Sequence, residues 1–72
     1  MLQFSERLKT CRKAITTQKS MAEYLGISER AYQHYEAGTR EPSLETICKL
    51  ADFFNVSVDY LLCRTDNPAI NR

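Results

Sequence analysis

Residues 18–37 read QKSMAEYLGISERAYQHYEA, and this stretch decides the fold. Gly26 lies near its middle, and a glycine there supplies the left-handed conformation that ends a helix. Ser28 follows directly and is a good N-cap for a second helix. The small side chain of Ala22, four residues before Gly26, allows the two helices to approach very closely. The stretch therefore predicts a short helix, a sharp turn and a second short helix that crosses the first.

Apolar side chains recur at steps of three and four residues in further segments, which predicts one more helix before this pair and two after it. The expected helices cover residues 4–15, 18–25, 29–37, 44–54 and 58–62. Their expected N-caps are Thr16 or Thr17, Ser28, Ser43 and Ser57. The first four are expected to bury Phe4, Leu8, Cys11, Ile15, Met21, Ala22, Leu25, Ala31, Tyr32, Tyr35, Leu44, Ile47, Cys48, Ala51 and Phe54. The predicted fold class is all-α, a compact bundle of five helices.

The whole chain has 72 residues and a mass of 8.3 kDa, which suits one small domain and excludes most enzymes and large ligand cavities. Apolar residues make up 43% and charged residues 26%, a balance typical of a folded chain. The longest apolar run, residues 60–63, is too short for a membrane span or a secretory segment, so we expect a cytoplasmic protein. We expect residues 1–63 to form the domain and residues 64–72 a flexible C-terminal tail.

Cysteine and histidine usage gives no support to metal or catalytic chemistry. The three cysteines, Cys11, Cys48 and Cys63, include no close pair, so neither a disulfide framework nor a Cys-x-x-Cys metal site is expected. Cys11 and Cys48 fall at apolar helical positions, where a small buried side chain is favoured over a redox group. His34 is the only histidine, and no Ser/His/Asp or Cys/His arrangement is suggested. We expect no enzyme activity, no metal and no cofactor.

Charge is distributed unevenly along the chain, although the net charge is only +1. Residues 1–40 hold seven Lys and Arg against four Glu, a balance of +3, and residues 41–72 hold three bases against five acids, a balance of −2. A small domain with this asymmetry can turn its basic side toward a polyanion and keep its acidic side away. Ordinary solvated helix faces are an equally good explanation of the charge alone.

The polar side chains of residues 29–37 fall on one flank of the predicted helix. A helix about 10–12 Å across fits the major groove of B-DNA, about 12 Å wide, where polar side chains reach base edges. Arg30 suits guanine and Gln33 suits adenine. Glu29 can accept from the cytosine amino group, and His34 can donate or accept. Solvation of an exposed flank is the alternative, and the turn that precedes the helix favours DNA.

Three strings extend the evidence beyond the turn: TQKSMAEYLGIS, YEAGTREPS and LETICKLADFFNVSVDYLL. With them, residues 4–63 resemble the lambda-repressor-like helix-turn-helix domains of the Cro/C1 type, also called the XRE family. The resemblance implies that residues 18–25 lie across the major groove and that residues 29–37 enter it. It also implies a phage-type or bacterial transcriptional repressor.

The resemblance further implies roles for individual residues. The implied base contacts are Glu29, Arg30, Gln33 and His34. The implied phosphate contacts are Thr17, Gln18, Lys19, Thr39 and Arg40. Arg12 and Glu36 resemble the family's internal ion pair, which positions helices more than it stabilises them, because desolvation offsets much of the attraction.

Three features depart from the family pattern. The connection between Arg12 and Gln18 is one residue shorter than expected. Tyr32 and Tyr35 stand where aliphatic residues are frequent, so they either complete the core or turn one hydroxyl toward a phosphate, and we favour the core. Cys63 replaces a glycine that often ends the last helix, which would strain that end or expose a thiol.

The expected function is sequence-specific repression by a homodimer on double-stranded DNA, with an inverted-repeat operator. Candidate dimer surfaces are the last helix, Phe53, Tyr60 and the tail. A protein antirepressor or toxin is a possible partner. The alternative function is an antitoxin-like module that binds a toxin protein and represses its own operon, and a purely structural helical domain is the plainest alternative.

Overall fold

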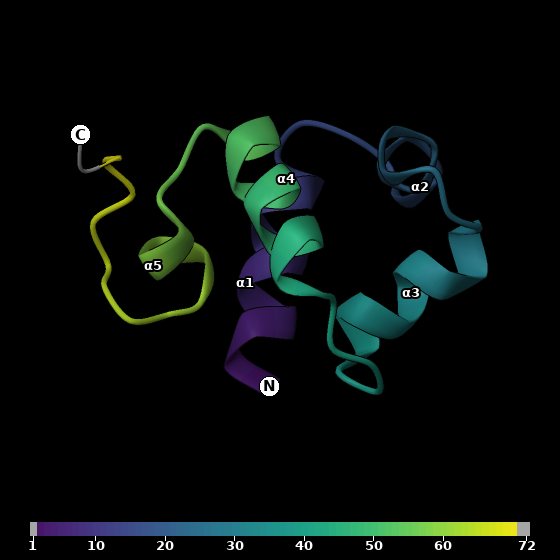
Figure 1. The fold of residues 1–72 in the computed structure, drawn as a ribbon, viewed down its shortest axis with the longest axis horizontal. Coiled ribbons are helices and arrows are strands. Elements are labelled where there is room, and N and C mark those ends of the chain that lie inside the picture. The colour runs from purple at the N-terminus through teal and green to yellow at the C-terminus, as the bar shows by residue number, and fades with distance from the viewer. Residues whose placement is uncertain (1, 71–72) are drawn as a thin grey trace.

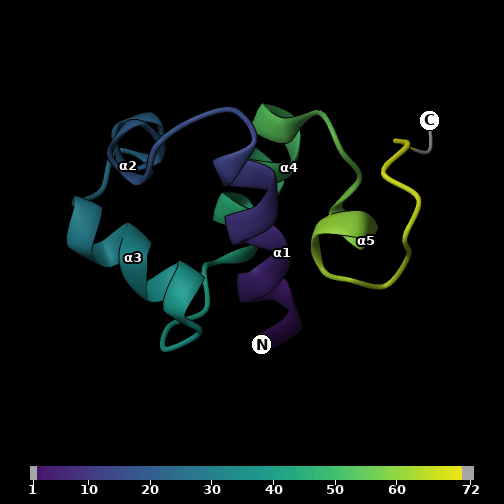
Figure 2. The ribbon, with the colours of Figure 1, turned by 180° about the vertical axis from the view of Figure 1, so that it is seen from behind.

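The computed structural model describes residues 2–70, and these form five helices and no strand. The helices are α1 (Leu2–Lys13), α2 (Gln18–Leu25), α3 (Glu29–Ala37), α4 (Leu44–Phe54) and α5 (Val58–Leu61). In Figures 1 and 2, α1 and α4 occupy the middle of the molecule, with α2 and α3 on one side and α5 and the chain after it on the other. The expected all-α bundle of five helices is confirmed.

Local capping explains where the helices begin and end. Each predicted N-cap accepts a hydrogen bond from the backbone N–H three residues further on, and Thr17 rather than Thr16 caps α2. Gly26 and Gly38 end α2 and α3 with φ of +72° and +78°. Asn55, at φ +57°, ends α4 in the same left-handed conformation. The boundaries of α2, α3 and α4 agree with the sequence prediction, whereas α1 was expected over residues 4–15 and α5 ends one residue earlier than expected.

Nine buried apolar side chains make up the core, and every described helix contributes to it. They are Phe4, Leu8, Met21, Ala22, Tyr32, Ile47, Leu50, Ala51 and Leu61. The prediction that Ile15 continues the buried stripe of α1 is wrong, since that side chain is 62% exposed. Helix α1 ends at Lys13, and the Arg12 carbonyl accepts from both Ile15 N and Thr16 N in a tight turn. This turn closes the short connection to α2 and directs Ile15 outward.

Two further predictions fail on α4. Leu44 is 72% exposed and Cys48 is also exposed, although both were expected inside. The buried face instead contains Leu50, which is fully buried, together with Ile47 and Ala51. Because Leu44 and Cys48 share one edge of the apolar stripe, rotating the buried face toward Leu50 leaves both in solvent. Cys11 is half-buried, and burial raises the pKa of its thiol.

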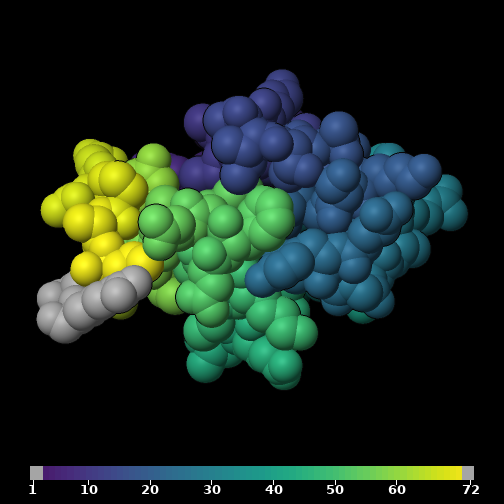
Figure 3. Space-filling model, turned by 90° about the horizontal axis from the view of Figure 1, so that it is seen from above, coloured from purple at the N-terminus to yellow at the C-terminus, as the bar shows by residue number. Residues whose placement is uncertain are grey.

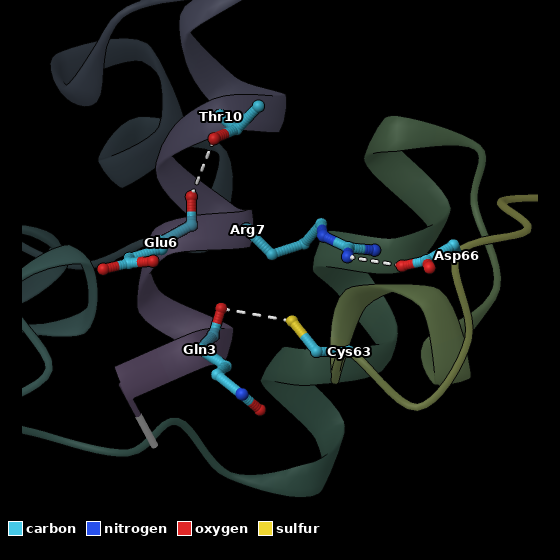
Figure 4. Close-up of a pocket in the computed structure, with 6 residues that line it drawn as sticks. All are labelled: Gln3, Glu6, Arg7, Thr10, Cys63 and Asp66. Atoms are coloured by element: carbon cyan, nitrogen blue, oxygen red, sulfur yellow. Dashed lines mark hydrogen bonds and ion pairs between the residues drawn. The ribbon is translucent and has the colours of Figure 1, made fainter.

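Residues 64–70 fold back beside α5 and α1. Ser57 N donates to the Pro68 carbonyl at 3.0 Å. Arg7 of α1 lies 4.1 Å from the ring centre of Tyr60, donates to the Tyr60 carbonyl at 2.9 Å and pairs with Asp66 at 3.4 Å. Figure 4 shows Arg7 and Asp66 at an open pocket of about 360 Å³, where the Cys63 thiol donates to the Gln3 carbonyl. Flexibility of the tail stays a prediction.

The last helix ends at a strained position. Cys63 has a φ of +64°, a conformation that non-glycine residues rarely adopt. Its N–H donates to the Tyr60 carbonyl at 3.0 Å, so the chain turns back directly after α5. Cys63 therefore holds the backbone conformation that a glycine would otherwise supply there, as its place in the sequence suggested.

Candidate nucleic-acid interface

The turn between α2 and α3 is built by local hydrogen bonds. The Gly26 N–H donates to the Glu23 carbonyl at 3.2 Å, and Ile27 N donates to the Ala22 carbonyl at 3.0 Å. Two residues later the Ser28 hydroxyl accepts from Ala31 N at 3.0 Å and starts α3. The chain thus leaves one capped helix and enters another within three residues. This geometry explains how two short helices are held at a fixed crossing.

The faces of α2 and α3 that meet are apolar and closely packed. Met21 and Ala22 of α2 and Tyr32 of α3 are all buried in the core. Tyr35 packs against this core and meets Tyr32 edge to face, with ring centres 6.4 Å apart. Both tyrosines therefore serve the core, and Tyr32, as favoured from the sequence, is fully buried. In Figure 3 the blue surface of α2 and the teal surface of α3 together occupy one end of the molecule.

The opposite flank of α3 is polar and exposed. Its exposed side chains are Glu29, Arg30, Gln33, His34 and Ala37. All four predicted base contacts thus lie on the same side of one helix, away from the core. The flank carries donors and acceptors together, which is what readout of base edges in a groove requires.

The end of α3 brings together two residues that were predicted to act separately. His34 Nδ1 lies 2.8 Å from Thr39 Oγ1, and the Thr39 hydroxyl also lies 3.4 Å from the His34 carbonyl. Thr39 N donates to the same carbonyl at 3.1 Å. His34 and Thr39 therefore form one hydrogen-bonded unit, although His34 was predicted to contact a base and Thr39 a phosphate. Arg40 follows and is exposed.

The predicted phosphate contacts at the start of α2 are not equivalent. The Thr17 hydroxyl accepts from Ser20 N and donates to Ser20 Oγ, each at 3.1 Å. Lys19 is exposed. Gln18 is half-buried, and its side chain points toward α3: its Nε2 donates to Glu36 Oε1 at 3.1 Å. Helical spacing carried a signal for this direction, because Gln18 stands three and four residues before the buried Met21 and Ala22 and therefore shares their face of α2.

Arg12 and Glu36, the predicted ion pair, meet in two parallel hydrogen bonds. Arg12 Nε donates to Glu36 Oε2 at 2.8 Å, and Arg12 Nη2 donates to Glu36 Oε1 at 2.9 Å. The two side chains are 12% and 2% exposed. The pair links the end of α1 to the last turn of α3, despite the short connection between Arg12 and α2.

Electrostatics at this pair follow from burial and hydrogen bonding. Burial alone would raise the pKa of Glu36, but hydrogen bonds from Arg12 and Gln18 outweigh it, so the pKa lies below its ordinary value. The same contacts raise the pKa of Arg12, with the Glu36 hydrogen bond as the main cause. The Tyr32 hydroxyl is buried beside the pair, outside hydrogen-bond geometry, and burial raises its pKa.

The hydrogen bonds continue from this pair to the exposed flank of α3. Gln33 Nε2 donates to Gln18 Oε1 at 3.3 Å. Arg12, Glu36, Gln18 and Gln33 therefore form one chain of contacts, which we call the Glu36 network. It joins a buried carboxylate to a predicted base contact, a connection that the sequence did not reveal.

Residues 2–70 hold no group of three or more His, Cys, Asp or Glu side chains that could bind a metal ion. None of the helices described has the length and apolarity needed to cross a membrane.

The capped turn and the exposed flank of α3 define a helix-turn-helix domain, and comparison with known proteins agrees. The family model described as Helix-turn-helix (HTH_3) matches residues 8–61. The chain therefore belongs to the helix-turn-helix family of the Cro/C1 type that its motifs resemble.

Several relatives are regulators of Bacillus subtilis (strain 168) or of Vibrio phages. The uncharacterized HTH-type transcriptional regulator YqaE of Bacillus subtilis is 46% identical over 68 residues, which is 93% of this chain and 59% of YqaE. The cryptic phage CTXphi transcriptional repressor RstR of Vibrio cholerae is 42% identical over 88% of this chain and 57% of RstR. The HTH-type transcriptional regulator ImmR of Bacillus subtilis is 44% identical over 85% of this chain and 49% of ImmR. The chain thus spans less than two thirds of these relatives.

Proposed function

We propose that this protein binds double-stranded DNA in a sequence-specific way and represses transcription. The observation that carries the proposal is the exposed polar flank of α3, held rigidly on the capped turn that follows α2. A helix about 10–12 Å across fits a major groove about 12 Å wide, so this flank can reach base edges. The similarity to RstR, a transcriptional repressor, favours repression over the toxin-binding alternative.

The base contacts proposed on α3 follow from donor and acceptor chemistry. Arg30 suits guanine and Gln33 suits adenine, since each can form two hydrogen bonds with its base. Glu29 suits the cytosine amino group. His34 completes the set, and Thr39 fixes its ring through Nδ1.

Phosphate contacts are proposed on both sides of α3. At the start of α2, the first N–H groups have no acceptor within the helix, and the exposed Thr17 and Lys19 lie next to them, whereas the Gln18 side chain turns toward α3. After α3, Thr39 and Arg40 supply the second set. Such contacts set the position of the protein on the duplex, whereas the flank of α3 selects the sequence.

A symmetric dimer on an inverted repeat is the proposed assembly. Two recognition helices in successive major grooves stand about 34–36 Å apart, and the longest dimension of this molecule is 32 Å. Two copies side by side can thus reach both half-sites. Of the candidate surfaces, Phe53 is half-buried and its ring lies tilted against that of Tyr24, with centres 4.8 Å apart, while Tyr60 is covered by Arg7.

Selection of binding sites from random duplexes with the purified protein tests this function. We expect an enriched inverted repeat whose half-sites lie about one helical turn apart. Titrations at several salt concentrations should then show affinity falling as salt rises, because phosphate contacts release counterions. Equal, weak binding to every duplex at low salt would overturn the proposal.

A further inference from the structure

We propose that Thr39 is a positioning residue: its hydroxyl holds the ring proton of His34 on Nε2, so that His34 selects guanine and rejects cytosine. The inference rests on the proposed function. Its basis is the contact at the end of α3, where His34 Nδ1 lies 2.8 Å from Thr39 Oγ1. Both side chains are exposed, and Nε2 lies across the ring from this contact. Thr39 therefore engages one ring nitrogen and leaves the other to meet a base.

The His34 carbonyl decides which way the Thr39 hydroxyl points. Its oxygen accepts from Gly38 N and, at 3.1 Å, from Thr39 N. A carbonyl oxygen has two lone pairs, and these two N–H groups occupy both of them. The Thr39 hydroxyl lies 3.4 Å from the same oxygen but only 2.8 Å from His34 Nδ1, which is a usual distance for a hydroxyl donor. The single hydroxyl proton therefore points to Nδ1.

This hydrogen bond fixes the form of the imidazole ring. Because Nδ1 accepts from Thr39, it carries no proton, and the neutral ring keeps its proton on Nε2. Turning the ring over would place a carbon atom against the hydroxyl and would lose the hydrogen bond. A doubly protonated ring also donates from Nε2, so His34 presents an N–H donor outward in either state.

The position of the ring proton decides which base edge His34 can meet in the major groove. Guanine presents two acceptors there, N7 and O6, whereas cytosine presents the N4 amino group, a donor. A fixed N–H donor therefore pairs with guanine and opposes cytosine. A ring without this constraint could turn its unprotonated nitrogen outward and accept from cytosine instead. The contact with Thr39 thus gives His34 a single preference.

The proposal gives Thr39 a different task from the phosphate contact that the family resemblance implies. Phosphate oxygens only accept hydrogen bonds, and both donors of Thr39 are engaged by His34. The N–H binds the His34 carbonyl, and the hydroxyl binds the His34 ring. Exposed Arg40 then carries the phosphate contact proposed after α3. Removing the Thr39 hydroxyl should thus change base choice more than overall affinity.

The test is Thr39→Val, which replaces the hydroxyl by a methyl group of similar size. Thr10→Val is the matched control, because Thr10 is exposed on α1 and its hydroxyl donates to the Glu6 carbonyl at 3.0 Å (Figure 4). Binding is titrated on the selected operator and on versions in which each G·C pair in turn is inverted to C·G. We expect Thr39→Val to reduce the preference for guanine about fivefold at one position of each half-site. Thr39→Ser, which keeps the hydroxyl, and Thr10→Val should leave every preference unchanged.

The ring proton can be located directly in the free protein. Because His34 is the only histidine, its two ring nitrogens give the only imidazole signals in long-range ¹⁵N–¹H spectra of the untagged chain. In mildly alkaline buffer, where an ordinary imidazole is neutral, we expect a ring protonated at Nε2 in the unmodified protein and in Thr39→Ser. Thr39→Val should move both signals toward those of a mixture of the two neutral forms. Circular dichroism checks that each variant is folded.

Three results would overturn the inference while leaving the proposed function intact. One is a ring protonated at Nδ1 in the unmodified protein. Another is an equal loss of affinity on all duplexes for Thr39→Val with base preference unchanged, which would make the hydroxyl a phosphate contact. The third is a further change of base preference when Thr39→Val is added to His34→Ala, since the two changes should not be additive. If the unmodified protein prefers no duplex at all, the proposed function itself fails.

Discussion

The Glu36 carboxylate is ionised although it is almost completely removed from water, and both of its oxygens are engaged by Arg12. A buried carboxylate of this kind is costly without its partners. The pair therefore specifies how α1 meets α3, and its main contribution is to hold one arrangement of helices. The Tyr32 hydroxyl beside it has no hydrogen-bond partner in the described residues, which makes this part of the core sensitive to any loss of the pair.

Stability should therefore depend on pH through Glu36. Its pKa is lowered in the folded state, so its contribution is fully present above the ordinary value of 4.5 and is lost as pH falls through the lower folded value. We expect urea denaturation to show stability falling as pH drops below 4.5. Glu36→Gln should lose about 1–3 kcal/mol at neutral pH and show a shallower decline in acid.

Glu45→Gln is the control, since Glu45 is exposed and its carboxylate lies 3.8 Å from the Lys49 ammonium, one helical turn away on α4. It should leave both the neutral stability and the acid decline nearly unchanged. An acid decline of equal steepness in Glu36→Gln and the unmodified protein would show that other groups control the acid transition.

Arg30 and Arg40 provide a second residue-scale prediction, because both are exposed yet are assigned different contacts. Arg30→Ala should cost about 1–3 kcal/mol on the selected site and relax base choice at one position. Arg40→Ala should weaken binding to all duplexes alike and reduce the salt slope by about one. Titrations against selected and random duplexes at several salt concentrations measure both. A uniform loss for Arg30→Ala would make it a phosphate contact.

Among the helices, α3 depends on its cap more than on its own propensity. It has nine residues, and helices this short are marginal in water without packing and capping. Its inner face is held by Tyr32 and Tyr35, and its outer flank makes few contacts within the protein. The direction in which α3 leaves the turn therefore decides where the exposed flank points.

Ser28→Ala should weaken this element in a way that a similar change elsewhere does not. Loss of the hydrogen bond from Ala31 N is expected to cost about 1 kcal/mol of stability. Ser43→Ala removes the equivalent bond at the start of α4 and should cost a similar amount. Only Ser28→Ala should also weaken binding to the selected operator when measured below the unfolding transition. Equal DNA affinity for the two variants would contradict the special role of this cap.

Over the whole molecule, Arg7 connects the two ends of the described chain. It stacks on Tyr60, donates to two backbone carbonyls and pairs with Asp66. These contacts join α1 to α5 and to residues 64–70 (Figure 4). On the side of the molecule opposite α3, the partly buried Arg7 side chain therefore holds α1, α5 and residues 64–70 together.

Arg7→Met should weaken the contacts between α1, α5 and residues 64–70 and leave α2 and α3 in place. We expect a loss of about 1–3 kcal/mol, from hydrogen bonds to a charged group and the cation–π contact. Hydrogen exchange should quicken at Ser57 and Arg64, whose N–H groups are bonded across this region. Lys9→Met, exposed on the same helix, is the control. Unchanged exchange at both positions would show that the region is held without Arg7.

Sequence patterns located the helices well because caps and stops act locally. Thr17, Ser28, Gly26 and Gly38 each work through neighbours within a few residues, so their roles can be read from order alone. The same reasoning failed for Leu44 and Cys48, and it overlooked Leu50. The apolar stripe that periodicity predicts on a helix is wider than the face that the helix buries. Which edge of that stripe is buried depends on the helices that pack against it.

The order of residues alone determined five helices, four of them with N-caps, a sharp bend at Gly26 and the polar flank of α3, since each arises from interactions between residues close in the chain. The tertiary structure alone shows that Gln18 donates to Glu36, that Gln33 is joined through Gln18 to this buried carboxylate and that Arg7 reaches residues 64–70. Those contacts join side chains distant in sequence, and their directions depend on how the helices cross.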